Sequence, residues 1–159
     1  MLAETGTYLI PTLSIGRWFL KHGREEGLTA KALEKGMVVC AHHYDAIRRA
    51  VKAGVKLAAG TDAIGSMHGG NADELAALVE EIGFSPMQAI VAATRNGAEV
   101  CRMADRVGTI DAGKLADLLL VNGDPLNDIR ILKDKERLTV FKQGTLVAGG
   151  ESLQQRQRS

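Results

Sequence analysis

The chain has 159 residues, and its 45% hydrophobic and 25% charged residues are the balance of an ordinary globular domain with a core of its own. Its 20 Lys and Arg residues against 19 Asp and Glu residues give a formal net charge of +1, so the charge gives no reason to expect nucleic acid or a membrane surface as a partner. No apolar run is long enough to span a membrane, and the N-terminal residues lack the pattern of a secretory signal.

The two cysteines, Cys40 and Cys101, lie far apart in apolar stretches of helical spacing. A free cysteine in such a stretch usually packs as a small buried side chain. We therefore expect two buried thiols, no disulfide between them, and a reducing, cytoplasmic location.

The first part of the chain is predicted to alternate short strands with helices. Pro11 restricts the first strand to a sheet edge or a strand end, because proline has no N–H to donate. Thr29 is expected to cap the N-terminus of a long helix and Gly54 its C-terminus. In chain order we expect a strand at 7–13, a loose helix or a loop at 15–26, a helix at 29–53 and a strand at 55–59.

Two further helices are predicted after a glycine-rich loop. The first, at 72–82, carries its leucine, valine and isoleucine side chains on one face and is ended by Gly83. The second begins with Ser85 as its N-cap and Pro86 in its first turn. Gln88, three residues after the cap, is the partner of a capping box, and this helix is expected to run to about 102.

The last third of the chain consists of short apolar runs separated by glycine and proline. We expect strands at 107–110, 115–121, 138–142 and 145–148, with a hairpin turn between the last two, and a frayed polar tail at 151–159. The strand–helix–strand order of the first part predicts a parallel pair, but two parallel strands alone are not a stable sheet.

Asp62 is the leading candidate for a functional residue. It follows the strand at 55–59 inside the turn Gly-Thr-Asp, and a carboxylate at the end of a buried strand is well placed for chemistry. The alternative is a structural aspartate that caps the turn through backbone N–H groups. His68 is either a substrate contact or a surface-loop histidine, and Thr61 either supports a ligating group or packs in the turn.

The remaining polar residues of this region have structural interpretations. Asn71 and Glu74 are expected to cap the N-terminus of the helix at 72–82, where acceptors and negative charge are favourable. The loop at 65–71 lacks the GxxxxGK[ST] pattern and a basic residue, so it is not expected to bind phosphate.

The other histidines are not expected to bind a metal. His42 and His43 are adjacent on a predicted helix, where neighbouring side chains point about 100° apart, so they do not easily share one ion. Nothing in the sequence around His22 gives it a role.

Four segments, in order, resemble the amidohydrolase superfamily, specifically its imidazolonepropionase-like and prolidase-like branch. GVKLAAGTD at 54–62 is similar to the family's eighth barrel strand with its terminal aspartate, and GTYLIPTLS at 6–14 is similar to the seventh. The stretches at 68–100 and 107–129 resemble the helices after that strand and the return into a small β-sandwich. One such segment is a weak match, whereas four in register cover nearly the whole chain.

The resemblance implies an α/β fold: the last part of a (β/α)₈ TIM-type barrel followed by a small β-sandwich portion. A complete barrel of this type takes about 250 residues, so the chain is expected to correspond to the C-terminal portion of a larger enzyme. We expect a partial barrel segment at 1–105, a β-sandwich portion at 106–150 and the polar tail at 151–159.

The resemblance also implies metal-dependent hydrolysis of an amide or dipeptide-like bond in a small molecule. Asp62 would ligate a divalent metal, with zinc favoured, and accept a proton from the activated water, while His68 would contact the substrate. The family's other ligands are a His-x-His pair, a lysine and two further histidines on earlier strands. The chain contains no His-x-His, so we expect it to bind metal weakly or not at all and to be inactive alone.

The alternative hypothesis is a non-catalytic remnant or a split-enzyme subunit. Two barrel strands leave apolar edges that invite pairing. Such a chain would associate with itself as a homo-oligomer, or with a missing N-terminal half.

Overall fold

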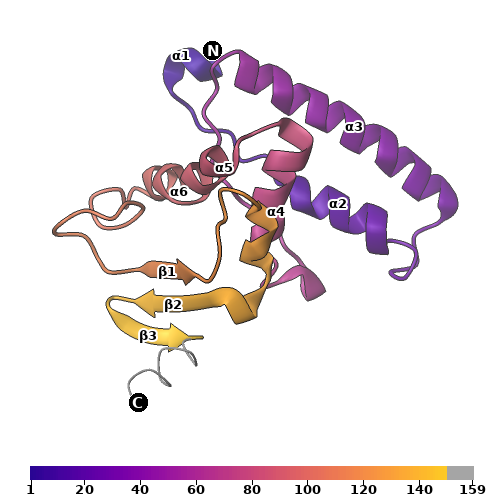
Figure 1. The fold of residues 1–159 in the computed structure, drawn as a ribbon. Helices are drawn as coiled ribbons and strands as arrows, with labels where there is room; N and C mark the ends of the chain where they lie inside the picture. The colour runs from indigo at the N-terminus through magenta and orange to yellow at the C-terminus, as the bar shows by residue number, and fades with distance from the viewer. Residues whose placement is uncertain (150–159) are drawn as a thin grey trace.

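The structure, a computed structural model, describes residues 1–149, and Figure 1 shows helices gathered on one side of a small antiparallel sheet. The tail expected at 151–159 lies outside these residues. No described helix is long and apolar enough to cross a membrane. The elements in chain order are α1 (Leu2–Thr5), α2 (Leu13–His22), α3 (Ala30–Lys52), the 3₁₀ turn η1 (Gly65–Met67), α4 (Ala72–Ala77), the π-helical turn η2 (Leu78–Ile82), α5 (Pro86–Ala93), α6 (Arg95–Val100), β1 (Leu118–Val121), the 3₁₀ turns η3 (Ile129–Lys133) and η4 (Lys135–Arg137), β2 (Leu138–Lys142) and β3 (Thr145–Ala148).

The two segments expected as parallel strands meet at one point only. Leu9 and Leu57 form an isolated parallel bridge, in which the Leu9 N–H donates to the Lys56 carbonyl at 3.0 Å and the Ala58 N–H donates to the Leu9 carbonyl at 3.1 Å. The predicted direction is correct, but the two predicted strands are not formed. Pro11 cannot continue the ladder, and the described residues place no further strand beside this pair.

The two helices between these segments both form, and the first is more regular than predicted. Where the sequence left a loose helix or a loop open at 15–26, α2 forms and already begins at Leu13. α3 matches its prediction, and the Thr29 hydroxyl caps it by accepting the N–H of Ala32 at 3.2 Å. The chain leaves α3 through Gly54, whose φ of 82° is left-handed. Figure 1 shows α2 lying beside α3, and the two helices are in contact.

The helices after the glycine-rich loop carry the predicted caps. The first forms as α4 continued by η2 and ends at Gly83, whose φ is 87°. The Ser85 hydroxyl accepts the Gln88 N–H at 3.2 Å, and the Gln88 side chain accepts the Ser85 N–H at 2.8 Å, which completes the capping box. The helix expected to reach about 102 is instead two helices, α5 and α6. They meet at Thr94, whose hydroxyl donates to a carbonyl one turn earlier at 2.7 Å.

The core lies in the helical part of the chain. The apolar face predicted for the helix at 72–82 is confirmed, because Leu75, Val79 and Ile82 pack against this core. Its buried members, from α2, α3, the second strand segment and the helices after the loop, are Leu13, Ile47, Leu57, Ala77, Leu78, Ala89 and Ala92.

The cysteine prediction is only partly correct. Cys40 is half-buried on α3, whereas Cys101 is exposed. Because α6 ends at Val100, Cys101 lies just beyond the helix and its packed face. The apolar residues spaced as in a helix continue beyond Val100, where α6 ends, so the sequence pattern did not reveal this end.

The antiparallel sheet has the order β1-β2-β3. β2 and β3 form where they were predicted, whereas the strand expected at 115–121 shortens to β1. The run at 107–110 is not a strand, because Val107 donates its N–H to the Met103 carbonyl at 3.0 Å and Gly108 turns the chain with a φ of 94°. The predicted hairpin is confirmed: Gln143 and Gly144 both have positive φ, 51° and 78°, as a tight two-residue turn requires.

Candidate functional site

The second strand segment is held in place by the helices that follow it. The Ala59 N–H donates to the Ala92 carbonyl at 3.0 Å, and the Asn96 amide donates to the Leu57 carbonyl at 2.7 Å. Asn96 was not singled out from the sequence, because its partner lies 39 residues earlier in the chain. These contacts fix the residues that lead directly into Thr61 and Asp62.

Asp62 stands at the end of this segment in an unusual backbone conformation. Its φ is 50°, in the left-handed region that aspartate tolerates better than most residues. Its side chain is exposed and makes no hydrogen bond or ion pair with another described residue. The alternative in which this carboxylate caps the turn is therefore wrong. The carboxylate is free to accept a hydrogen bond from a ligand.

A cavity of about 780 Å³ lies next to this segment. It is lined by α2, by the glycine-rich loop after Asp62, by α4, and by η3 and η4 of the C-terminal unit. Thr61 and His68 both line it, whereas Asp62 is not among the lining residues. The structure thus brings two of the three candidate residues together at the cavity and leaves the Asp62 carboxylate beside it.

The lining combines apolar and cationic side chains. Trp18, Leu75 and Leu132 contribute apolar surface. The cationic side chains are those of Arg17, Lys21, Lys133 and Lys135, and Asp73 is the acidic one. Sequence reasoning could not find this cavity, because it separated the helical part from the C-terminal unit that supplies one wall.

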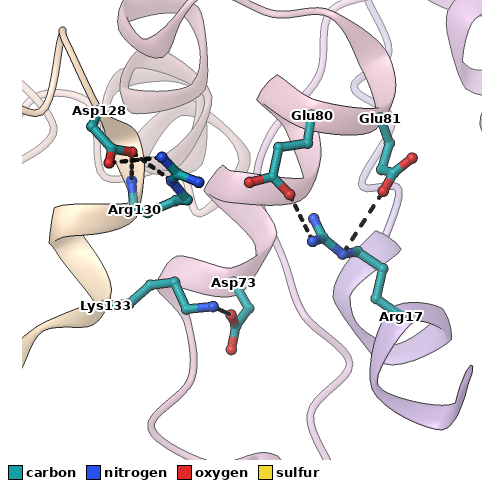
Figure 2. Close-up of polar contacts among 7 residues, drawn as sticks. All are labelled: Arg17, Asp73, Glu80, Glu81, Asp128, Arg130 and Lys133. Carbon is teal, nitrogen blue, oxygen red and sulfur yellow. Dashed lines mark hydrogen bonds and ion pairs between the residues drawn. The ribbon is translucent and has the colours of Figure 1, made fainter. Parts of the chain in front are cut away.

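Figure 2 shows that two of these cations are already paired with carboxylates. Arg17 contacts Glu80 at 2.6 Å and Glu81 at 3.9 Å, and Lys133 pairs with Asp73. The Nη1 atom of Arg17 is buried and has no hydrogen-bond partner among residues 1–149.

The remaining cations at the cavity are unpaired. Lys21 and Lys135 make no ion pair with any residue that the structure describes, and the His68 side chain makes no hydrogen bond there. Free positive charge beside an apolar wall suits a ligand that has an anionic group and an apolar body.

Glu74 corrects the expectation of a local helix cap. Its side chain is only 1% exposed, and it accepts backbone N–H groups from Leu13 at 3.0 Å and Ser14 at 2.8 Å, at the start of α2. Asn71 precedes α4 without a side-chain capping bond. Burial raises the pKa of the Glu74 carboxyl, and the two N–H groups oppose that rise. No local sequence signal marks this role, since its partners lie about sixty residues earlier.

The other histidines lie in different surroundings. His22 lines the cavity, stacks near Trp18 with ring centroids 5.3 Å apart, and bonds to Glu25 at 3.1 Å. The sequence had given it no role. His42 and His43 lie on α3 and do not line the cavity.

The described residues do not make a metal site by themselves. Nowhere within residues 1–149 do three His, Cys, Asp or Glu side chains come together in a way that could hold an ion. A catalytic zinc takes about three protein ligands. Asp62 and His68 therefore fit at most part of a metal centre.

Comparisons with known proteins agree on one family. The profile of the Amidohydrolase family matches residues 1–147. The chain is 34% identical over 151 residues to ochratoxinase from Aspergillus niger, which covers 94% of this chain and 31% of that protein.

Two solved structures are similarly close. One is a Xaa-Pro dipeptidase with methionine bound in its active site, with 37% identity, a TM-score of 0.80, and coverage of 93% of this chain and 36% of that one. The other is a prolidase complexed with N-methylphosphonate-L-proline, with 32% identity, a TM-score of 0.80, and coverage of 92% and 36%. The chain spans about a third of the length of these relatives.

Proposed function

This chain belongs to the amidohydrolase family, and we propose that it supplies the strand-end aspartate of a hydrolase active site. The resemblance predicted from its four segments is confirmed by the family match, and the chain corresponds in extent to one part of such a protein. The observation that carries the proposal is the exposed Asp62 carboxylate, which follows a fixed segment and has no partner among the described residues.

In this proposal Asp62 accepts the proton of the attacking water. A carboxylate within hydrogen-bond reach of a nucleophilic water can act as a general base, and a free carboxylate is available to do so. A divalent metal, zinc being favoured, would lower the pKa of that water when bound. Since residues 1–149 do not complete a metal centre, its other ligands would have to come from outside the described residues.

The proposed substrate is a small amide or dipeptide-like molecule with a carboxylate. The unpaired Lys21 and Lys135 and the exposed His68 at the cavity suit an anionic group, and the Trp18 and Leu132 side chains suit an apolar one. The structures to which the chain is similar include a Xaa-Pro dipeptidase with bound methionine and a prolidase complexed with N-methylphosphonate-L-proline.

The same proposal assigns the two parts of the chain. Residues 1–105 would be the end of a (β/α)₈ barrel, with the segments around Leu9 and Leu57 as its seventh and eighth strands, and 106–150 a portion of a β-sandwich. The parallel direction of the bridge and the antiparallel sheet that follows support this assignment. In a barrel of this kind reacting groups lie at the C-terminal ends of strands, where Asp62 is.

Hydrolysis of N-acyl amino acids and Xaa-Pro dipeptides, with added Zn²⁺, tests the catalytic assignment. We expect Asp62→Asn to lower the rate by about 100-fold or more, because it removes a general base without changing the size of the side chain. Asp105→Asn is the matched control, since Asp105 is exposed and lies away from the cavity. Equal rates for the wild type and Asp62→Asn would contradict the assignment.

Ligand binding gives an independent test of the substrate class. Titration of the chain with N-acetylproline, followed by NMR, should shift the signals of His68 and Lys135. Lys135→Gln should weaken binding about tenfold, because it removes one charged contact. Binding that is unaffected by Lys135→Gln and by removal of the ligand's carboxylate would argue against an anion subsite.

A second candidate, association without catalysis, is favoured by exposed apolar side chains. On α3, Met37 is 56% exposed, Val38 54% and Val39 56%, and Ile10 beside the parallel bridge is 43% exposed. Exposed apolar side chains of this kind can contribute to an interface with a second copy or a partner. Light scattering over a concentration series should show a dimer or larger species that Val38→Lys shifts towards monomer. A monomer at every concentration would count against this candidate.

A further inference from the structure

Glu74 is a buried carboxylate that the proposed chemistry does not use. It lies in the first turn of α4, and its side chain is only 1% exposed. Burying a carboxylate is unfavourable unless hydrogen bonds or an opposite charge compensate it. Glu74 has no ion pair among the described residues, so its two backbone N–H bonds provide the compensation.

These bonds place Glu74 at the start of a helix that is not its own. Leu13 and Ser14 are the first two residues of α2, directly after the first strand segment. Thr12, the residue before them, has a left-handed φ of 48° and makes no side-chain cap. Glu74 therefore supplies the negative acceptor that the N-terminus of α2 needs.

Ser14 also links this contact to the segment that ends in Asp62. Ser14 is 4% exposed, and its hydroxyl donates to the Thr61 carbonyl in a long hydrogen bond of 3.5 Å. Thr61 immediately precedes Asp62, whose left-handed backbone needs support from its neighbours. One buried carboxylate thus connects the end of the first segment, through Ser14, to the end of the second.

We propose that Glu74 is a positioning residue that fixes the Thr61–Asp62 backbone through Leu13 and Ser14, an inference that builds on the proposed role of Asp62. The loop after Asp62 leads into α4, so Glu74, beyond the far end of that loop, is linked through Ser14 to Thr61 beside its start. The arrangement holds both strand ends and the loop in one hydrogen-bonded unit. The Asp62 carboxylate itself takes no part in these hydrogen bonds.

Amide hydrogen exchange of the full chain tests this coupling without any need for activity. Glu74→Gln keeps the shape of the side chain but replaces one acceptor oxygen with an NH₂ group, so one of the two N–H groups loses its partner. We expect exchange to rise about tenfold at residues 13–16 and 61–64, the effect of losing one hydrogen bond. Exchange in the middle of α3 should not change.

Ser14→Ala separates the two steps of the connection. It preserves the backbone N–H that Glu74 accepts and removes the hydroxyl, which lies near both the Thr61 carbonyl and the Glu74 carboxylate. Exchange should then rise more at 61–64 than at 13–16. Glu80→Gln is the matched control, because Glu80 pairs with Arg17 at the surface and contacts neither strand end. A uniform rise across the chain in both variants, or unchanged exchange at 61–64, would overturn the proposal.

Failure of this inference and failure of the proposed function can be told apart. If Asp62→Asn leaves the hydrolysis rate unchanged while Ser14→Ala still raises amide exchange at 61–64, the catalytic role of Asp62 is wrong. The hydrogen-bonded connection to Thr61 is then still supported. Where hydrolysis is measurable, Glu74→Gln, at a buried residue that does not line the cavity, should lower kcat with little change in KM, because it misplaces the base rather than the substrate. An unchanged kcat in that variant would remove the positioning role.

Discussion

The helical part and the C-terminal sheet are stabilised in different ways. All the clustered core side chains come from residues before the sheet, and several of them, such as Leu78 and Ala89, are fully buried. In the sheet, by contrast, no residue of β1, β2 or β3 is buried, and Leu119, Leu120 and Val147 are each about half exposed. The helical part has a core of its own, whereas the described sheet does not.

The sheet depends on its hydrogen bonds and on one point of packing. Asp117 pairs with Lys142 and accepts the Gln143 N–H at 2.8 Å, which ties the hairpin to the residues before β1. Ile129 of η3 is 3% exposed, and η3 contacts α4, where Lys133 also pairs with Asp73 (Figure 2). Leu119 and Leu120 are successive residues of β1 and point to opposite faces, so apolar side chains are about half exposed on both faces of the sheet.

The largest expected effect is a loss of stability that distinguishes the helical part from the sheet. Leu78→Ala removes a fully buried side chain from the helical core and should lower the free energy of unfolding by about 3 kcal/mol. Leu120→Ala, at a sheet position that is 47% exposed, should change it by no more than about 0.5 kcal/mol. Urea denaturation measures both. Equal losses would show that the sheet is as well packed as the helices.

Ile129→Ala tests the point where the two parts meet. Because its side chain is 3% exposed, the substitution should cost about 2 kcal/mol. The loss should be local. Amide exchange should rise in β1, β2 and β3 and change little in α3, and an equal rise in both parts would mean that they unfold as one unit.

A smaller effect is expected from the ionisation of Glu74. Burial raises its pKa above the ordinary 4.5, while the N–H groups of Leu13 and Ser14, the Ser14 hydroxyl and the charge of His43 oppose the rise. The folded chain therefore binds this proton more tightly than the unfolded chain. The stabilisation of the fold by this bound proton is fully present below pH 4.5 and is lost as the pH rises through the folded-state pKa.

Glu74→Gln provides the reference for this pH dependence, since glutamine does not titrate. Urea midpoints of the two proteins, compared across that pH range, should show the stability of the wild type falling relative to the variant as the pH increases. A difference between them that does not vary with pH would contradict the shift.

The smallest effect concerns the hairpin of the sheet, where one substitution is expected to stabilise the chain and its neighbour to destabilise it. Gln143 occupies a left-handed conformation that glycine adopts at no steric cost, so Gln143→Gly should stabilise the chain by about 0.5 kcal/mol. Gly144→Ala, at a φ of 78°, should destabilise it by about 1 kcal/mol. Thermal unfolding of both variants measures the pair, and a loss of stability in Gln143→Gly would show that backbone entropy outweighs the turn geometry.

Several local signals in the sequence were reliable, because their partner groups lie close together in the chain. The Thr29 cap, the Ser85 capping box and the two-residue hairpin turn each depend on residues within about one helical turn of one another. Some failures were also local, such as the helix break at Thr94 and the turn at Gly108, but others depend on distant neighbours. The strand at 7–13 did not form because only one bridge to the second segment is available.

The sequence by itself determined the family, the caps and turns, the apolar face of the helix after the loop, and the position of Asp62 at the end of its segment. These features follow from residue type and short spacing. Only the tertiary structure decided that Glu74 caps α2, that Ser14 reaches Thr61, and that a cavity with unpaired cations opens between α2 and the C-terminal unit. Such contacts join residues far apart in the chain, and their energy depends on burial and distance, which no local pattern encodes.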